Sequence, residues 1–486
     1  MANPKSRIRR LFSHPSEAMQ DGDREEILYV TCSPSNPEEN KGHPDVLITL
    51  DVQSDSDTYG KVIHQLRMPH VGDEISRLGW NTCMSCYGED ESASHGMLVV
   101  TCLRSSRIYI IDVATNPRAP AIKKVIEDEM IRERSGLTSP TTSHCLGFGQ
   151  VMVSAFDKGE DQCDKGGFFV LDGETLDVKE RWDSGHDSNV FCHDFWYQLL
   201  THNVIISSTG WGRRDIFNGQ TSIKDAISQA SDSRNLHVWD FEKRTVTQAI
   251  DLGEDGAVPL AVRFLHDADQ SVGFVSSASG SAIFKFFKTS DDKWYAKKVI
   301  SFTPGELSRD GYKSLPAVTS DLVLSLNDRF LYCCNWMYRE VRQYDVTDTD
   351  NPKLVGQVQI CEVYDKNANP DEGGVKGQRI HGGPSNMTLS LDGRRLYVTT
   401  SLFSRWDAEI YPDTVKNGSS LVMIDINPDE GGLTLNQGFM AELTGLGDDG
   451  TSVPLLAKEM RYPGGDCTSD IFLSLCSLQP KKVVKE

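Results

Sequence analysis

The sequence has no long hydrophobic run and no excess of basic residues. None of its apolar stretches approaches the ~20 residues that a transmembrane helix needs. The N-terminus is basic and then polar, without the apolar core and cleavage site of a secretory signal. The 486 residues carry a formal net charge of −20, which argues against binding to nucleic acid or to an anionic membrane, because both need a basic surface. We therefore expect a cytoplasmic protein with no integral membrane segment and no nucleic-acid partner.

Motifs of the common nucleotide-binding and hydrolytic enzymes are also absent. The sequence has no GxxxxGKS/T phosphate loop, no GxSxG nucleophile motif and no HExxH metal motif. The twelve cysteines are spread through a long chain, whereas a disulfide framework is typical of short secreted proteins. We expect most of these cysteines to be reduced and to pack as small buried apolar groups.

A repeated strand pattern is the strongest signal in the sequence. Residues 324–332 (LSLNDRFLY) and 389–397 (LSLDGRRLY) each predict a strand, a tight polar turn and a second strand, followed later by a strand that ends in an acidic residue. The Asn-Asp and Asp-Gly pairs suit two-residue hairpin turns, which need residues that tolerate positive φ. The same strand-plus-acid ending recurs at residues 107–112, 167–172 and 236–240.

This repetition predicts an all-β fold, a β-propeller of about seven blades, because each four-stranded blade is one repeat of roughly 45–65 residues. The inner strands are expected to begin at seven places, near Trp80, His144, His193, Pro259, Thr319, Gly382 and Asp466. The N-terminal strands at 27–32 and 45–52 are expected to complete the last blade, so that both termini share it and no sheet edge stays exposed.

The predicted organisation is a single propeller between two terminal segments. A flexible tail is expected at residues 1–24, the propeller at 25–472 and a C-terminal extension at 473–486. Helical periodicity is scarce, and residues 122–134 (IKKVIEDEMIRER) are the best helix candidate.

Three histidines stand at the predicted starts of different inner strands: His144, His193 and His381. Because the inner strands of a propeller converge on one axis, these side chains can meet there. Imidazole is a ligand for copper, zinc, iron and nickel, and three histidines with an open position would form a catalytic metal site. The alternative is that they are ordinary polar residues of a wet channel. Cys83 and Cys86 form a CxxC pair, but the redox interpretation of that spacing belongs to a βαβ context, which this sequence does not predict.

Several long segments resemble the selenium-binding protein family, which includes the methanethiol oxidases. The matching segments extend over nearly the whole chain and include residues 79–86 (GWNTCMSC), 142–145 (TSHC), 166–174, 194–198, 401–407 and 461–471. The resemblance implies a cytosolic propeller that oxidises methanethiol with O2 and water to formaldehyde, hydrogen sulfide and hydrogen peroxide, using copper held by histidines. It also implies selenium bound through cysteine, for which Cys83 and Cys86 are the candidates. Members of the family are further described as acting in intra-Golgi transport and as occurring in the nucleus and at membranes. Protein partners are therefore possible for this chain as well.

The chain departs from the family pattern where many members have paired histidines. Ser76 and Arg77 occupy that position, and Thr141 replaces a further histidine three residues before His144. The charge of Arg77 is expected to weaken copper binding and to favour an anionic thiolate or selenolate. Three functions stay open at this point: a copper-dependent thiol oxidase, a non-enzymatic propeller that binds selenium or a metal, and a protein-interaction platform.

Overall fold

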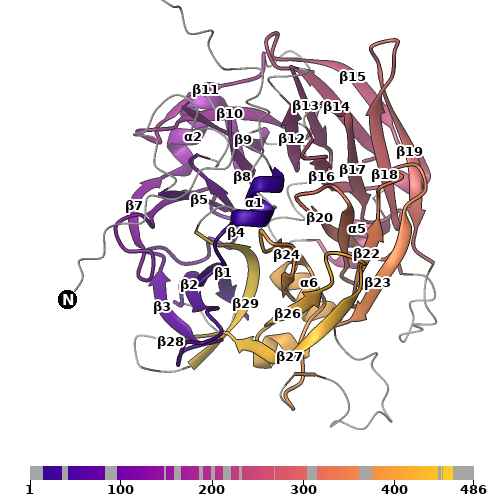
Figure 1. Cartoon of the computed structure of the whole chain (residues 1–486). Coiled ribbons are helices and arrows are strands. Elements are labelled where there is room, and N and C mark those ends of the chain that lie inside the picture. The colour runs from indigo at the N-terminus through magenta and orange to yellow at the C-terminus, as the bar shows by residue number, and fades with distance from the viewer. Residues whose placement is uncertain are drawn as a thin grey trace, which may run out of the picture.

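Seven antiparallel sheets surround one axis in the described part of the chain (Figure 1). The computed structural model describes residues 15–35, 42–82, 96–146, 149–157, 166–184, 190–198, 203–211, 221–228, 233–267, 269–303, 315–360, 374–375, 377–446, 450 and 452–463. Within these residues six sheets have four strands and one has five. The architecture is a seven-bladed β-propeller, which confirms the predicted fold class.

The blades are numbered in chain order, with the strands of each given from the axis outward. Blade 1 contains β4 (Ile75–Trp80), β5 (Met97–Cys102), β6 (Ile108–Asp112) and β7 (Ala121–Ile126). Blade 2 contains β8 (Leu137–Cys145), β9 (Gln150–Asp157), β10 (Gly166–Asp172) and β11 (Val178–Arg181). Blade 3 contains β12 (Phe195–Gln198), β13 (Val204–Ser208), β14 (Asn235–Asp240) and β15 (Thr245–Asp251). Blade 4 contains β16 (Pro259–Phe264), β17 (Val272–Ser277), β18 (Ala282–Lys288) and β19 (Trp294–Ser301).

The remaining blades follow the same plan. Blade 5 contains β20 (Thr319–Leu324), β21 (Phe330–Asn335), β22 (Glu340–Asp345) and β23 (Lys353–Gln359). Blade 6 contains β24 (Asn386–Leu389), β25 (Arg395–Thr399), β26 (Ser420–Ile426) and β27 (Leu433–Glu442). Blade 7 contains β29 (Ser452–Arg461), β1 (Ile27–Pro34), β2 (Val46–Asp51) and β3 (Val62–Arg67), with the short β28 (Thr444–Leu446) on the other edge of β29.

Burial along the strands explains why these segments stack as blades. Strands in the second position, such as β1, β13 and β21, are buried along their whole length. Neighbouring blades cover both of their faces, so these strands lack the polar alternation of a half-exposed sheet. The outermost strands, such as β7 and β23, mix exposed and partly buried residues. The core is therefore a ring of apolar layers between the blades.

Blade 7 closes the ring by joining the two ends of the chain. β29 pairs antiparallel with β1, and Tyr29 lies opposite Arg461. The prediction that N- and C-terminal strands share one blade is thus confirmed. The inner strand of this blade is β29, however, and not the segment beginning near Asp466, which lies outside the described residues. Charged Lys458 and Glu459 interrupt the apolar pattern of β29, which hides it in the sequence.

The predicted strand starts are right for some blades and wrong for others. β16 begins at Pro259 and β20 at Thr319, as expected. Trp80, in contrast, is the last residue of β4, and His144 is the second-last residue of β8. β8 contains two register shifts, on either side of Pro140, and such irregular strands have no clean alternation.

The helices are short and lie between or before the strands. They are α1 (Pro15–Asp21), α2 (Asp128–Ser135), α5 (Ile223–Ser228), the 3-10 helix η3 (Glu254–Gly256), α6 (Ser404–Ile410) and α7 (Asp413–Asn417). The predicted helix at 122–134 is correct only for its second half, because the first half is β7, which pairs with β6. No helix in the described ranges is long and apolar enough to cross a membrane.

Helix α1 falls within the segment predicted as a flexible tail at 1–24. Its residue Ala18 is fully buried and belongs to the same core cluster as Leu391 of blade 6. This part of the tail is therefore packed on the propeller. Residues 1–14 and the extension at 473–486 lie outside the described residues, so their predicted character stays a prediction.

A buried ion pair joins the segment before β1 to blade 6. Its removal tests how much this contact contributes to the stability of the closed ring. The Glu25 carboxylate accepts bonds from Arg395 at 2.5 and 3.0 Å and from the Tyr397 hydroxyl at 2.8 Å. We expect Arg395→Met to lower the free energy of unfolding by about 3 kcal/mol, because it leaves a buried carboxylate without its cation. Urea unfolding measures the change.

The matched control is Arg234→Met, which removes an exposed ion pair with Asp251. We expect a loss of about 0.5 kcal/mol or less from this variant. Equal losses for the two variants would contradict a role of the Glu25 pair in ring closure.

Candidate functional site

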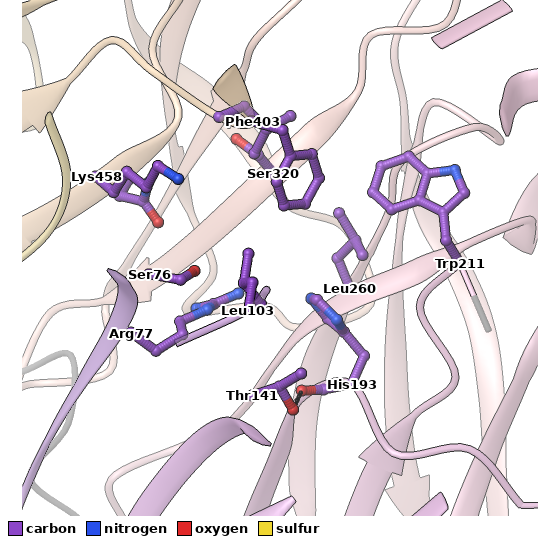
Figure 2. Close-up of a pocket in the computed structure, with 12 residues that line it drawn as sticks. Ser76, Arg77, Leu103, Thr141, His193, Trp211, Leu260, Ser320, Phe403 and Lys458 are labelled. Atoms are coloured by element: carbon purple, nitrogen blue, oxygen red, sulfur yellow. Dashed lines mark hydrogen bonds between the residues drawn. The ribbon is translucent and has the colours of Figure 1, made fainter. Parts of the chain in front are cut away.

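A small cavity lies on the propeller axis, and every blade contributes to its wall. We call it the axial pocket (Figure 2). From the inner strands and the residues just before them come Ser76, Arg77, Thr141, His193, Leu260, Ser320, Asn386 and Lys458. Leu103, Trp211, Leu402 and Phe403 complete the lining. The cavity volume is about 30 Å³, which is room for about two water-sized molecules.

The charged side chains that line the axial pocket are both cationic, Arg77 and Lys458. Their carboxylate partners stand behind them. Lys458 donates to Glu74 at 2.8 Å, and the same carboxylate bonds Arg104 at 2.6 Å. Burial alone would raise the pKa of Glu74, but Lys458 and Arg104 hold it at about 2. Glu74 is therefore ionised and shared between two cations.

Arg77 has an analogous arrangement with Glu459. The guanidinium of Arg77 lies 3.6 Å from the Glu459 carboxylate, which also bonds Arg461 at 3.0 Å. A separation of 3.6 Å is an ion pair beyond hydrogen-bond distance. The other oxygen of Glu459 accepts the backbone N–H of Leu78. Glu74 and Glu459 are thus each shared between two cations, and the charges of Asp194 and Asp321 also act on Arg77.

A second group of charges lies next to the pocket around Arg263. Its guanidinium contacts Asp194 at 2.8 Å and Asp321 at 3.3 Å. Asp194 also accepts the N–H of Val262, and Asp321 accepts the N–H of Met387. Each of these carboxylates belongs to one blade and bonds the inner strand of the next. Asp194, Asp321 and Glu459, which we call the axial carboxylates, therefore join blades 3 to 4, 5 to 6 and 7 to 1.

His193 is the predicted histidine that the structure places in the axial pocket. It precedes β12, and its backbone carbonyl accepts a bond from the Thr141 hydroxyl at 2.9 Å (Figure 2). Burial and the nearby charge of Arg77 lower the pKa of His193 to about 3, so the imidazole is neutral at pH 7. Gly210 packs directly on it, because a Cβ at Gly210 would lie 2.5 Å from the His193 Cβ.

The other two predicted histidines do not line the axial pocket. His144 lies between blades 2 and 3, with its ring 5.0 Å from the rings of Phe195 and Trp196. His381 precedes β24 and is half-buried. Its backbone N–H donates to the Ser420 hydroxyl at 3.2 Å. In the described part of the chain, no group of three or more His, Cys, Asp or Glu side chains could hold a metal ion. The shared copper ion stays a prediction, and this arrangement does not support it.

The cysteines divide into those that the structure describes and those that it does not. Cys83 and Cys86, the selenium candidates, lie outside the described residues, so that assignment stays a prediction. The described cysteines are all buried and free: Cys32, Cys102, Cys145, Cys192, Cys333 and Cys334. Burial raises the pKa of the Cys32 and Cys192 thiols, which keeps them protonated and poorly reactive.

An apolar segment covers the pocket, and the sequence did not indicate its role. We call residues 401–404 the strap, because it leads into α6 and places Leu402 and Phe403 against the cavity. The Phe403 ring packs 4.9 Å from Trp406 and 6.3 Å from Trp211. These contacts make the covering side of the pocket apolar.

Two buried carboxylates hold the strap at its ends. Asp407 accepts a bond from the Ser401 hydroxyl at 2.6 Å, and Glu74 accepts one from the Ser404 hydroxyl at 3.0 Å. Because Glu74 also bonds Lys458, the strap and the cationic wall share one carboxylate. Asp407 lies six positions after Ser401, so sequence reasoning could have found this contact, whereas Glu74 is 330 positions from Ser404 and gave no such signal.

Comparisons with known proteins agree with the motifs. The family model described as 56 kDa selenium binding protein matches residues 9–473. A methanethiol oxidase of Xenopus laevis is 45% identical over 476 residues, which cover 95% of this chain and 98% of that protein. Selenium-binding protein 3 of Arabidopsis thaliana is 40% identical, with 95% and 96% covered. The X-ray structure of a hypothetical selenium-binding protein from Sulfolobus tokodaii has a TM-score of 0.83 and 31% identity, with 95% and 98% covered.

The contact between Gly210 and His193 gives a test of the pocket geometry. We expect Gly210→Ala to displace His193, because the new methyl group would overlap the His193 Cβ. The displaced side chain should abolish the binding of ligands in the axial pocket. The control is Gly253→Ala, at a similar positive φ but with no atom within 4 Å of the new Cβ. Both variants bear the backbone strain of a left-handed residue. A crystal structure of Gly210→Ala with His193 unmoved would contradict the prediction.

Proposed function

The chain belongs to the 56 kDa selenium-binding protein family, and from that premise we propose that it oxidises small thiols in the axial pocket. Methanethiol, named for its relatives, is the first candidate substrate. The reaction consumes one molecule each of methanethiol, O2 and water and yields one each of formaldehyde, hydrogen sulfide and hydrogen peroxide. The C–S bond breaks, and carbon takes its new oxygen from water. O2 accepts the two electrons and, with two protons, becomes hydrogen peroxide.

The size of the axial pocket is the observation that carries this proposal. A volume of about 30 Å³ suits a ligand of two or three heavy atoms, and methanethiol has two. Leu103, Leu260 and Phe403 offer an apolar surface to a methyl group, while Arg77 and Lys458 offer donors to sulfur. Peptide thiols are too large for this space.

Copper held by histidines is the group that the family resemblance implies, and the axial pocket does not fit it. His193 is the histidine in the lining, and Arg77 and Lys458 beside it repel a cation. No step of the proposal passes through copper. A copper site at His144, His193 and His381 stays a prediction that metal analysis tests, and selenium at Cys83 or Cys86 stays one as well.

A propeller that binds thiols or selenium without oxidising them is the second candidate. The observation that favours it is the lack of a metal-ligand group among the described side chains. Such a protein would use the same pocket and the same cationic wall. Protein partners and a cytoplasmic location are compatible with either candidate and stay predictions.

Product analysis separates the two candidates. We expect purified protein to convert methanethiol to formaldehyde and hydrogen peroxide in equal amounts, with O2 consumed in the same proportion. His193→Ala should lose this activity, because it alters the pocket. His237→Ala should keep it, because His237 is a buried histidine of β14 that does not line the pocket. Metal content is measured on the same samples. Binding of methanethiol without formaldehyde would exclude the oxidase and support the second candidate.

Phe403 should set the length of thiol that the pocket accepts. We expect Phe403→Ala to raise kcat/KM for ethanethiol relative to methanethiol by about tenfold or more, since one methylene group in an apolar pocket changes discrimination by roughly 10–200-fold. The control is Phe241→Ala. Phe241 follows β14 of blade 3 and stacks on Trp182, which follows β11 of blade 2. Because it does not line the pocket, this variant should leave the ratio unchanged. The ratio of the two kcat/KM values is the readout. An unchanged ratio in Phe403→Ala would show that the strap does not limit substrate size.

A further inference from the structure

We propose that the axial pocket binds its thiol as the thiolate anion, held by Arg77 and Lys458 in the place of a metal ion. The ligand class is a small monovalent sulfur anion, such as methanethiolate or hydrosulfide. The inference rests on the proposed function only in that the same pocket receives the thiol. It adds the charge state of the ligand and the groups that hold it.

The first support is the sign of the charges that face the cavity. Arg77 and Lys458 line it, and no carboxylate is among its described lining residues. Figure 2 shows the Lys458 ammonium, the Arg77 guanidinium and the His193 ring around one central space. A ligand in this space therefore meets cationic donors before any acidic group.

The second support is the way in which the cations are neutralised. Glu74 is shared by Lys458 and Arg104, and Glu459 is shared by Arg77 and Arg461. These carboxylates do not line the cavity, whereas the Lys458 ammonium and the Arg77 guanidinium do. An entering anion would therefore be attracted by the charges nearest to it, and an entering cation would be repelled by them.

The third support is burial. The Lys458 side chain is 2% exposed and that of Arg77 is 16% exposed. Charge–charge interactions are stronger where water is excluded. Burial alone raises the pKa of a thiol, whereas a cation in direct contact with the sulfur stabilises the thiolate and lowers that pKa. Capture as the thiolate requires that the two cations together outweigh burial. In the binding step the S–H bond breaks, the electron pair stays on sulfur and the proton leaves to the solvent.

The apolar part of the lining separates this anion from the common oxyanions. The cavity, of about 30 Å³, is lined by Leu402 and Phe403 of the strap as well as by the cations. It therefore favours a ligand with one apolar end and one anionic end. Methanethiolate has both, whereas sulfate and phosphate have no apolar end.

Calorimetric titration with methanethiol tests the proposal on the full chain, without O2 and after removal of metals with a chelator. At pH 7.5 free methanethiol is protonated, so capture as the thiolate should release about one proton per molecule bound. Titrations in two buffers of different ionisation enthalpy give this number. Binding without proton release, or binding that is lost with the metals, would overturn the proposal.

Variants locate the anion within the pocket. Arg77→Gln should weaken binding of hydrosulfide by about tenfold to a hundredfold, since charge-assisted bonds contribute that much. Arg77→Lys should restore most of the affinity because it keeps the charge. Arg244→Gln, in an exposed ion pair with Glu180, is the matched control and should bind as the original chain does. Equal affinity in Arg77→Gln and the control would contradict the assignment.

The same titrations distinguish this proposal from the proposed function. Anaerobic binding with proton release but without aerobic product would exclude the oxidase and leave the thiolate site established. Aerobic product formation with no proton released on anaerobic binding would support the oxidase and exclude the thiolate site.

Discussion

Compensation of buried charge on the axis is the constraint on which the rest of this propeller depends. Seven inner strands meet in a space with little room for water, and ionised groups there need partners. The axial carboxylates meet this need with bonds to arginines and to backbone N–H groups of the next blade. Removing one partner of such a buried pair is costly, because the remaining charge is left uncompensated. The charges therefore fix the relative positions of the blades as well as the electrostatics of the pocket.

Strand β29 connects this constraint to the closure of the ring. It completes blade 7 by pairing with β1, and it also supplies Lys458, Glu459 and Arg461 to the axis. The contact between Lys458 and Glu74 joins residues 384 positions apart in the sequence. Formation of the pocket and closure of the propeller are consequently one event. A chain with an open ring would lack the part of the cationic wall that β29 supplies, Lys458.

The sequence predicts the architecture better than the site. Repeated hairpins with polar turns and acidic strand ends were sufficient to predict a propeller of about seven blades, because each repeat can be recognised from local sequence alone. The strand starts at Pro259 and Thr319 were correct, although each of these strands contains one register shift, against two in β8. His144 was misplaced because β8 is irregular around Pro140, which moves this histidine to the far end of its strand. Lys458 and Phe403 were not found, because only the closed ring brings them to the axis.

The pairing of β1 with β29 also has a consequence for biosynthesis. Thr31 of β1 bonds Glu459 of β29, 428 residues further along the chain. At a synthesis rate of about 5–20 residues per second, β1 waits roughly 20–90 s on the ribosome before its partner exists. During that time one edge of an apolar strand is open to pairing with other chains. The risk of aggregation is therefore highest during synthesis and ends only when the last strand is complete.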